Sequence, residues 1–428
     1  MKSRYLVLFM CLLATVAIVG CDLFGSDDDD DTVISGSYAT ISGKIVDLTG
    51  NVITSAFNVS GGNKTLDTDT GSFKLENATI DATGKIILTI SGAGYLNNYA
   101  VEAINAGQTV IATYTMRAIP ANGAKATYDL TADVTASQTT TKVTTQRAKI
   151  DLKAGSVLNS DGTSATSAEI TVVHTMPKED ADAKPLDIFP GIFAGVPTDS
   201  AAEVPFETFG FVYVDLGTDA NGKARTLDKT KPAKLIMPID PTMLAKADAT
   251  IKLWSYDTTK GQWIQEGTAT KVGNNYEAEV THFSWYNLDR PFDAAVRTLK
   301  VTVASYTYTF DHENMGEEGS VDTNKTDLSK RVANAKVIVT ATLDSSSTDG
   351  EGFWTANNAE GYPATDVTTT WKEVSSTNSS GEATFTIPSG RRIAIEVVAE
   401  DGSRADGYGY EITDSVASAF VNLGGYID

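Results

Sequence analysis

The sequence predicts an all-β chain that is built of tandem β-sandwich modules. Short alternating runs rich in β-branched residues, such as Ile86–Ile90, recur from about Tyr38 onward. Turn signals such as Thr49-Gly50-Asn51 and Gly92-Ala93-Gly94 separate these runs. Helical periodicity is nearly absent, and its best candidate, Pro241–Ala249, is short. A chain of 428 residues with this pattern is long enough for several sandwiches of Ig-like or transthyretin-like type.

Residues 1–20 have the physical form of a secretory signal. A positive end, Lys2 and Arg4, precedes an apolar stretch over residues 5–19 that is too short for a comfortable transmembrane helix. Ile18-Val19-Gly20-Cys21 resembles a bacterial lipobox, in which the chain is cut before a cysteine that carries lipid. The resemblance implies a lipoprotein anchored to a membrane through acylated Cys21. The alternative is an ordinary secretory signal with a chance cysteine.

Residues 21–37 are predicted to form an acidic, flexible tether, because the consecutive aspartates Asp27–Asp31 repel one another and stay solvated. Loss of Lys2 and Arg4 with the signal would leave 32 basic and 55 acidic side chains, a formal charge of −23. So acidic a protein is not expected to bind nucleic acid or to offer a basic membrane-binding surface, since both targets are anionic.

Cysteine use limits the chemistry of the folded body. Cys11 lies inside the signal stretch, Cys21 is the proposed lipid-bearing residue, and the sequence contains no other cysteine. The mature body is therefore expected to lack disulfides, cysteine zinc sites and a cysteine nucleophile. Its stability must come from ordinary hydrophobic cores, and no second long apolar run predicts a further membrane span.

Residues 38–119 are predicted to form the first sandwich. Ser42–Asp47 is predicted to form its first strand. Asp67–Phe73 predicts a turn followed by a strand in which Phe73 points inward, and Gly92–Tyr95 predicts a late turn before an aromatic ring. These segments resemble the carboxypeptidase regulatory-like domain, a transthyretin-type β-sandwich. The resemblance implies a carbohydrate-binding-like fold for this module.

Residues 120–291 are predicted to form a central β-sandwich that ends in the most specific sequence of the chain. Leu253–Asp257, Gly261–Trp263 and His282–Asn287 hold three of the five tryptophans within a short span. This region resembles the corresponding part of cartilage intermediate layer protein and its bacterial relatives. It is also similar to the end of the β-sandwich shared by ankyrins and netrin receptors. The resemblance implies an extracellular or scaffold module rather than an enzyme.

The aromatic residues of this span allow two interpretations. Alternate positions such as Trp254 and Tyr256 lie on one face of a strand, where they either fill a core or form a sugar-stacking platform. Trp263 and Trp285 are the other candidates for ligand stacking. The core interpretation is preferred, because a sandwich needs large inward side chains.

His282-Phe283-Ser284 permits one chemical hypothesis. In some scaffold relatives of the ankyrin-type sandwich, a His-Phe-Ser sequence breaks its own chain between Phe and Ser. The serine hydroxyl would attack the preceding carbonyl while the histidine accepts the proton. A purely structural role for His282 is the preferred alternative.

Residues 292–428 are predicted to form a C-terminal β-sandwich that resembles a second regulatory-like module. Val332–Val337 reads as an early strand, and Thr377–Pro388 mirrors Asp67–Phe73, with a polar turn, a glycine and an alternating strand. A long insertion separates these two pieces. Arrays of such modules usually serve as spacers or binding platforms.

No cofactor is expected. The three histidines, His174, His282 and His312, are not at metal-ligand spacing, and His174 lies in an alternating run where a wall position is favoured. Asp67 and Asp69 are weak Ca²⁺ candidates, but their loop lacks the terminal acidic ligand of an EF-hand, so a solvated turn is the better interpretation.

The expected function is a non-enzymatic binding, adhesion or spacer role in the bacterial cell envelope, with a protein or carbohydrate ligand. Autoproteolysis between Phe283 and Ser284 is the alternative, and an envelope hydrolase is a weaker one, since no carboxylate pair or nucleophile elbow stands out. The acidic tether favours the outer membrane or cell surface. Asp22, by contrast, resembles a signal that retains lipoproteins at the periplasmic face of the inner membrane.

Overall fold

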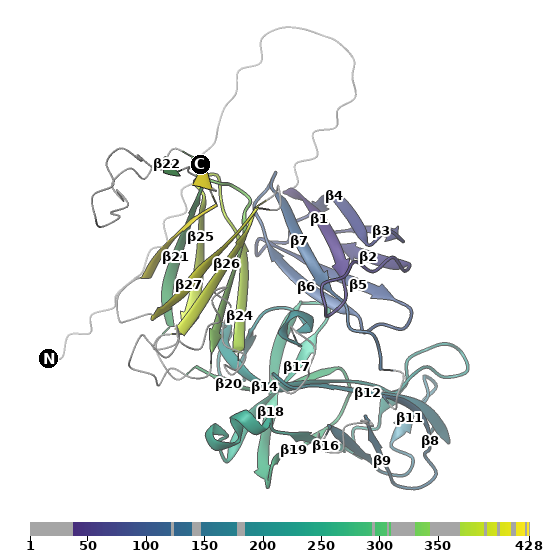
Figure 1. Cartoon of the computed structure of the whole chain (residues 1–428). Helices are drawn as coiled ribbons and strands as arrows, with labels where there is room; N and C mark the ends of the chain where they lie inside the picture. Colours follow the sequence, from purple (N-terminus) through teal and green to yellow (C-terminus); the bar gives the residue numbers. More distant parts are fainter. Residues whose placement is uncertain are drawn as a thin grey trace, which may run out of the picture. The chain divides into compact units, whose positions relative to one another are not determined.

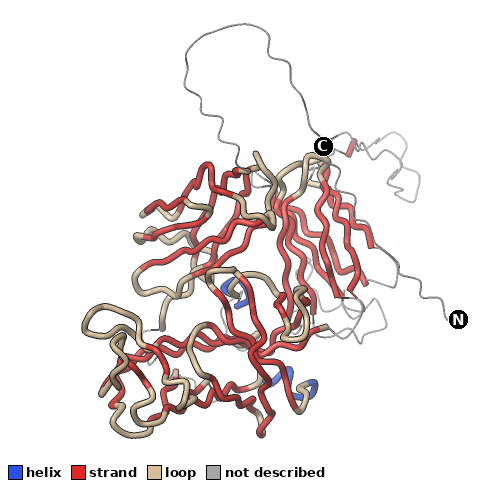
Figure 2. Tube along the Cα trace, turned by 180° about the vertical axis from the view of Figure 1, so that it is seen from behind, coloured by secondary structure: helices blue, strands red, loops and turns tan. Residues whose placement is uncertain are grey.

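The computed structural model describes residues 37–120, 124–138, 147–177, 185–292, 296–305, 308–309, 330–342, 369–388, 392–399, 403–411, 417–423 and 426–427. The signal-like segment, Cys21 and the aspartate run lie outside these ranges. Figure 2 shows strands almost throughout the described chain, with two short 3-10 helices, η1 (Pro185–Ile188) and η2 (Pro241–Lys246). The predicted fold class, all-β with tandem β-sandwich modules, is confirmed. None of the helices in these ranges is long and apolar enough to cross a membrane.

The N-terminal sandwich consists of two sheets (Figure 1). One has the order β4-β1-β7, in which β1 runs antiparallel to β4 and parallel to β7, and the other has the order β3-β2-β5-β6. Alternate residues of β1 and β5 point inward, which gives a core that includes Ile41, Val59, Leu88 and Ile90. The strands are β1 (Tyr38–Val46), β2 (Phe57–Gly61), β3 (Lys64–Thr68), β4 (Ser72–Thr79), β5 (Lys85–Gly92), β6 (Asn98–Ala103) and β7 (Thr109–Thr115).

The C-terminal sandwich repeats this topology. Its sheets have the orders β25-β21-β28 and β24-β23-β26-β27, and β21 is antiparallel to β25 and parallel to β28. Each of the seven strands in these two sheets thus takes the place of one strand of the N-terminal sandwich, while β22 and β29 form a separate pair. The strands are β21 (Val296–Ala304), β22 (Tyr308–Thr309), β23 (Lys336–Thr342), β24 (Thr369–Ser376), β25 (Glu382–Pro388), β26 (Arg392–Val398), β27 (Arg404–Glu411), β28 (Ala417–Asn422) and β29 (Tyr426–Ile427).

The repeat extends to the turn before the fourth strand of each module. Gly71 and Gly381 both have φ of +69°, and their carbonyls accept hydrogen bonds of 2.8 Å from the backbone of Ile45 and Val303. A Cβ at Gly71 would lie 2.4 Å from the Ile53 carbonyl oxygen, so both conformation and space require glycine there. The two polar turns that looked alike in the sequence therefore have the same backbone geometry.

The central module contains one 11-stranded sheet with the order β8-β12-β14-β20-β17-β18-β19-β16-β10-β9, to which β13 adds by pairing with β14 and β18. A separate two-stranded sheet pairs β11 with β15. The ends of this sheet approach each other, since the Ser137 amide donates to the Tyr128 hydroxyl over 3.4 Å. The strands are β8 (Lys125–Asp129), β9 (Val134–Ser137), β10 (Lys149–Leu152), β11 (Val157–Leu158), β12 (Ser167–Thr175), β13 (Ala194–Val196), β14 (Val204–Asp215), β15 (Thr226–Leu227), β16 (Ala233–Pro238), β17 (Thr250–Asp257), β18 (Gln262–Val272), β19 (Asn275–Val280) and β20 (Trp285–Pro291).

Two hydrophobic cores lie against opposite faces of the central sheet. Ile251 and Leu253 of β17 belong to one core, and Trp254 and Tyr256 of the same strand belong to the other. The strand period of two explains this division, because neighbouring side chains point to opposite faces. The sheet is therefore packed on both sides along β17.

Candidate functional site

The four aromatic side chains proposed for ligand stacking lie in the core. Trp254 and Trp263 are fully buried, and Tyr256 and Trp285 are 3% and 2% exposed. Their faces meet other rings, as the centroids of Tyr256 and Trp263 are 5.2 Å apart. The preferred core interpretation agrees with this burial. The sugar-stacking alternative is wrong for these residues, because no face of the four rings is open to a ligand.

The cover over these rings comes from a segment distant in sequence. Phe189 and Phe193 follow η1 and stack on each other with centroids 3.9 Å apart, and Phe189 lies 5.0 Å from Trp263. The Trp263 indole Nε1 donates to the Pro190 carbonyl over 2.8 Å. Alternation along β17 correctly places Trp254 and Tyr256 on one face, but strand pattern alone does not reveal what covers that face.

The His282–Ser284 segment connects β19 to β20, and both reactive side chains are held by other groups. The His282 imidazole Nε2 donates to Glu266 Oε1 on β18 over 2.6 Å. The Ser284 hydroxyl donates to the Tyr256 carbonyl over 3.1 Å. These two contacts direct the imidazole and the hydroxyl to different partners, so the structure provides no His–Ser pair of the kind that activates a hydroxyl.

The ion pair at this segment changes the acidity of both partners. The hydrogen bond to Glu266 raises the pKa of His282, against the opposing effect of burial. Burial opposes ionisation of Glu266, but hydrogen bonds from His282 and Ser255 outweigh it and lower the pKa of that carboxyl. The pair is half-exposed, with side-chain exposures of 42% and 31%, so it is worth little in stability.

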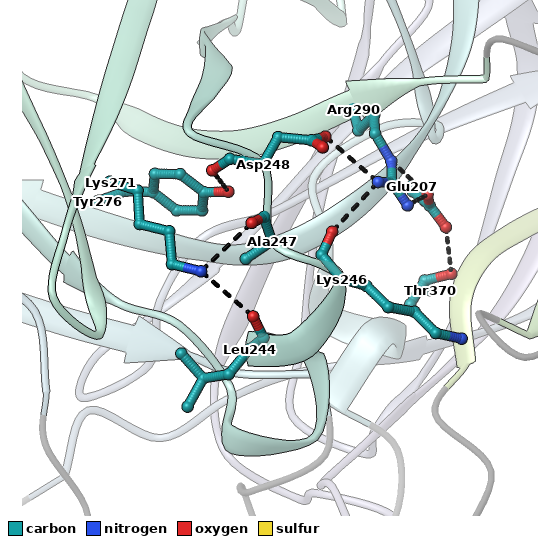
Figure 3. A network of polar contacts seen from close by, with 9 residues as sticks. All are labelled: Glu207, Leu244, Lys246, Ala247, Asp248, Lys271, Tyr276, Arg290 and Thr370. Carbon is teal, nitrogen blue, oxygen red and sulfur yellow. Dashed lines mark hydrogen bonds and ion pairs between the residues drawn. The ribbon is translucent and has the colours of Figure 1, made fainter.

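A polar network shown in Figure 3 fixes the loop that follows η2. Arg290 of β20 donates from Nε to Glu207 Oε1 over 2.8 Å and from Nη1 to Asp248 Oδ2 over 3.2 Å. The Lys271 ammonium donates to the carbonyls of Leu244 and Ala247, each over 3.2 Å. Thr370 of β24 donates to the second Glu207 oxygen over 3.4 Å. The network satisfies groups that would otherwise be buried alone, and its role is structural.

A second buried polar group lies beside this network. Thr208, Asn287 and Asp289 are fully buried, and the Thr208 hydroxyl donates to Asn287 Oδ1 over 2.7 Å while the Asn287 amide donates to Asp289. Burial raises the pKa of Asp289 well above its usual range, which favours the protonated form of this carboxyl. The cluster sits where a register shift interrupts the β14–β20 ladder. No local sequence signal identifies it, since it depends on the pairing of two distant strands.

The calcium candidates are not gathered into a metal site. Asp67 Oδ1 accepts a hydrogen bond of 2.9 Å from the Asn58 amide, its partner across β2 and β3. Asp69 is exposed in the turn that follows. Within the ranges that the structure covers, no group of three or more His, Cys, Asp or Glu side chains is arranged to hold a metal ion. His174 is fully buried in β12, at the predicted wall position.

An opening of about 680 Å³ lies where β18 and β19 separate. Its lining includes Glu266, Thr268 and Thr270 of β18, and Glu277 and Glu279 of β19. Lys234 of β16 forms an ion pair of 2.6 Å with Glu277. The sequence did not single out these residues, because the opening depends on strand pairing rather than on a motif. It is a candidate binding site in the described part of the central module.

Comparison with known proteins gives a limited result. No family model matches the chain, and no curated protein matches it. Among solved structures, the Bacillus anthracis TIE protein is 11% identical at a TM-score of 0.16, and the match covers 90% of this chain and 50% of that one. The chain thus spans about half the length of that protein.

Two further structures are similar at the same low level. A putative membrane-associated protein of unknown function from Bacteroides fragilis is 10% identical at a TM-score of 0.17, covering 60% of this chain and 98% of that one. BcpA, the major pilin subunit of Bacillus cereus, is 8% identical at a TM-score of 0.13, covering 90% and 98%. Such scores do not indicate a shared overall arrangement, and the proposals below rest on the residues of this chain.

Proposed function

We propose that this chain is a lipid-anchored protein of the bacterial cell envelope, with a non-enzymatic role in binding or adhesion or as a spacer. The observation that carries the proposal is Ile18–Cys21, which resembles a lipobox, followed by the aspartate tether and by sandwich modules. The likeness of the first and central modules to regulatory-like and scaffold domains supports the same conclusion. Display at the outer membrane or cell surface is favoured over the periplasmic face of the inner membrane.

A protein ligand is favoured over a glycan. Sugar binding by stacking needs an accessible aromatic face, and Trp254, Tyr256, Trp263 and Trp285 are buried. The surface of the central module instead offers carboxylates, hydroxyls and strand edges. These groups suit hydrogen bonding to a polypeptide.

Lipidation is tested by metabolic labelling with an alkyne-bearing fatty acid. We expect label on the wild type and on Cys11→Ser, because Cys11 leaves with the signal, and none on Cys21→Ser. Label retained on Cys21→Ser would contradict the anchor. Protease treatment of intact cells then distinguishes the two membranes, since only a surface-displayed body is cut before the cells are opened.

Autoproteolysis between Phe283 and Ser284 stays a prediction of the sequence. Because His282 and Ser284 are engaged with Glu266 and Tyr256, we expect a single full-length chain in denaturing electrophoresis and intact-mass measurement. Two fragments that divide at this bond, lost in Ser284→Ala, would reverse that expectation.

An envelope hydrolase remains the weaker proposal. Glycoside cleavage needs one carboxyl that keeps its proton near neutral pH beside one that is ionised. Glu266, at the β18–β19 opening, has a lowered pKa and does not fit the acid role. Asp289 has a raised pKa but is fully buried and beyond the reach of a substrate.

A further inference from the structure

The inference concerns the opening between β18 and β19, and it deepens the proposed binding role. These strands form a hairpin around Gly273, whose φ is +62°, and only three residue pairs join them: Thr270–Glu277, Lys271–Tyr276 and Val272–Asn275. Beyond these pairs the strands follow different neighbours, since Thr268 pairs with Lys252 of β17 and Ala278 with Leu235 of β16. No ladder in the described structure joins residues 266–269 to residues 278–280.

The separation leaves backbone hydrogen-bonding groups facing the opening. In a two-residue hairpin, the residues beside the turn exchange backbone hydrogen bonds, and every second pair after them does the same. Counting from Val272–Asn275, the next such pair is Thr270–Glu277, and the one after it would be Thr268 with Glu279. These two residues are not paired with each other, and the alternation of the hairpin places their N–H and C=O groups on the side of the opening. Unpaired strand edges of this kind accept another strand.

The rim of the opening is acidic. Its carboxylates are Glu266, Glu277 and Glu279. Glu277 forms an ion pair with Lys234 and Glu266 forms one with His282, so Glu279 is the rim carboxylate that keeps an unbalanced negative charge. Val272, one of the two large hydrophobic residues most exposed in the described chain, lies at the same rim with 49% exposure. The volume of about 680 Å³ lies within the usual ~300–1,000 Å³ of ligand sites.

We propose that this opening binds an extended, cationic peptide segment of a partner protein. The segment adds to the edge of β18 through the Thr268 backbone, and its Lys or Arg side chains face Glu266 and Glu279. Main-chain hydrogen bonds supply the attachment and the acidic rim supplies the charge preference, as in other strand-addition complexes. The proposal rests on the binding role proposed above.

Three substitutions test different parts of the site. Gly267→Phe fills the opening, since a Cβ at Gly267 meets no atom within 4 Å and its backbone needs no positive φ. Thr268→Pro removes the inward-facing N–H, and Glu279→Lys reverses one rim charge. Glu76→Lys, at an exposed carboxylate of β4 in the N-terminal sandwich, is the matched charge control. Circular dichroism establishes that each variant is folded before it is used.

The experiment pans a phage-displayed library of random nonapeptides against the full chain in detergent micelles. We expect enriched peptides with alternating Lys or Arg and β-branched residues. We expect their affinity to fall tenfold or more in Gly267→Phe, Thr268→Pro and Glu279→Lys and to stay within twofold in Glu76→Lys. Hydrogen exchange should show protection of residues 266–270 and 277–281 when a synthetic copy of an enriched peptide is added.

Several results overturn the proposal: no enrichment, enrichment of acidic or proline-rich peptides, or affinity that all folded opening variants retain. A glycan array hit that Gly267→Phe abolishes would also overturn it, in favour of a saccharide. If the chain adheres to cells and the opening variants adhere equally well, the inference fails while the binding role stands. If the wild type neither adheres nor binds any probe, both fail.

Discussion

Exchange of two buried tryptophans for phenylalanine separates the contribution of one hydrogen bond from that of packing. Trp263 and Trp285 are 0% and 2% exposed, so Trp→Phe removes the same atoms from similarly closed sites. They differ in their indole N–H groups. Trp263 donates to the Pro190 carbonyl over 2.8 Å, whereas the Trp285 N–H is buried and has no hydrogen-bond partner.

This difference between the two indole N–H groups determines how far the two substitutions should differ in the free energy of unfolding. Trp263→Phe leaves the Pro190 carbonyl buried and unpaired, which costs about 1–3 kcal/mol beyond the loss of packing. Trp285→Phe loses comparable packing but removes an unsatisfied donor, so part of its cost is offset. We therefore expect Trp263→Phe to be the less stable variant by about 2 kcal/mol. At a typical urea m-value of about 2 kcal/mol/M, this difference corresponds to about 1 M in the unfolding midpoint.

The measurement must report the central module alone, because a chain of several modules need not unfold in one step. Hydrogen exchange with mass spectrometry at increasing urea gives the midpoint for residues 250–291 directly. The reasoning is refuted if the two variants unfold at the same urea concentration or if Trp285→Phe unfolds first.

Three further predictions concern a glycine turn, aspartate turns and the histidine pair. Gly50→Ala should lower the free energy of unfolding by about 1–2 kcal/mol, because Gly50 has a φ of +87° and a Cβ there would lie in open space. Gly71→Ala should lower it clearly more, because its Cβ would also meet the Ile53 carbonyl. Equal urea midpoints for the two variants would contradict this. Hydrogen bonds from threonine lower the pKa of turn aspartates such as Asp161. The ionised aspartates should therefore stabilise the fold above about pH 3.9, and this stabilisation should be lost as pH falls through the lowered pKa. An acid-unfolding curve that is unchanged in Asp161→Asn would count against it. The His282 pKa is raised, so the stabilisation from its ion pair should be complete below about pH 6.5 and be lost as pH rises through the raised value. NMR titration should show a lower His282 pKa in Glu266→Gln, and no change would exclude the ion pair.

The structure reveals a regular aspartate turn that the sequence analysis did not single out. In seven places of the described chain, an aspartate Oδ1 accepts hydrogen bonds from both the backbone N–H and the hydroxyl of the threonine two residues later. This Asx-type contact is local, so an Asp-x-Thr sequence favours it. The sequence alone does not guarantee it, because Asp133 and Asp248 also precede a threonine by two residues but accept hydrogen bonds from Ala154 and Arg290 instead. The acidic composition is therefore due in part to turn formation. The aspartates are Asp47, Asp81, Asp129, Asp161, Asp228, Asp240 and Asp257.

Local pattern explains what was predicted of the fold, and long-range pairing explains what was not. The alternation of Ile86–Ile90 is a property of neighbouring residues and identifies a strand. The single curled sheet of the central module depends on which distant strands become neighbours, as when β20 inserts between β14 and β17. The cover that Phe189 places over Trp263 has the same origin. A motif such as His282-Phe283-Ser284 shows which groups are near one another in sequence, but not that the histidine faces Glu266 instead of the serine.

The packing of the central sheet restricts where a partner can bind. Along β17 both faces carry buried cores, so neither face is open to a macromolecule. A partner can then meet this part of the sheet only at an edge, at a loop or where strands separate. The β18–β19 opening combines two of these, since Thr268 presents an unpaired backbone edge beside the loop that holds His282. Packing thus buries the aromatic rings, which cannot contact a sugar. The groups that remain accessible at the opening are backbone groups and carboxylates, whose chemistry suits a cationic polypeptide.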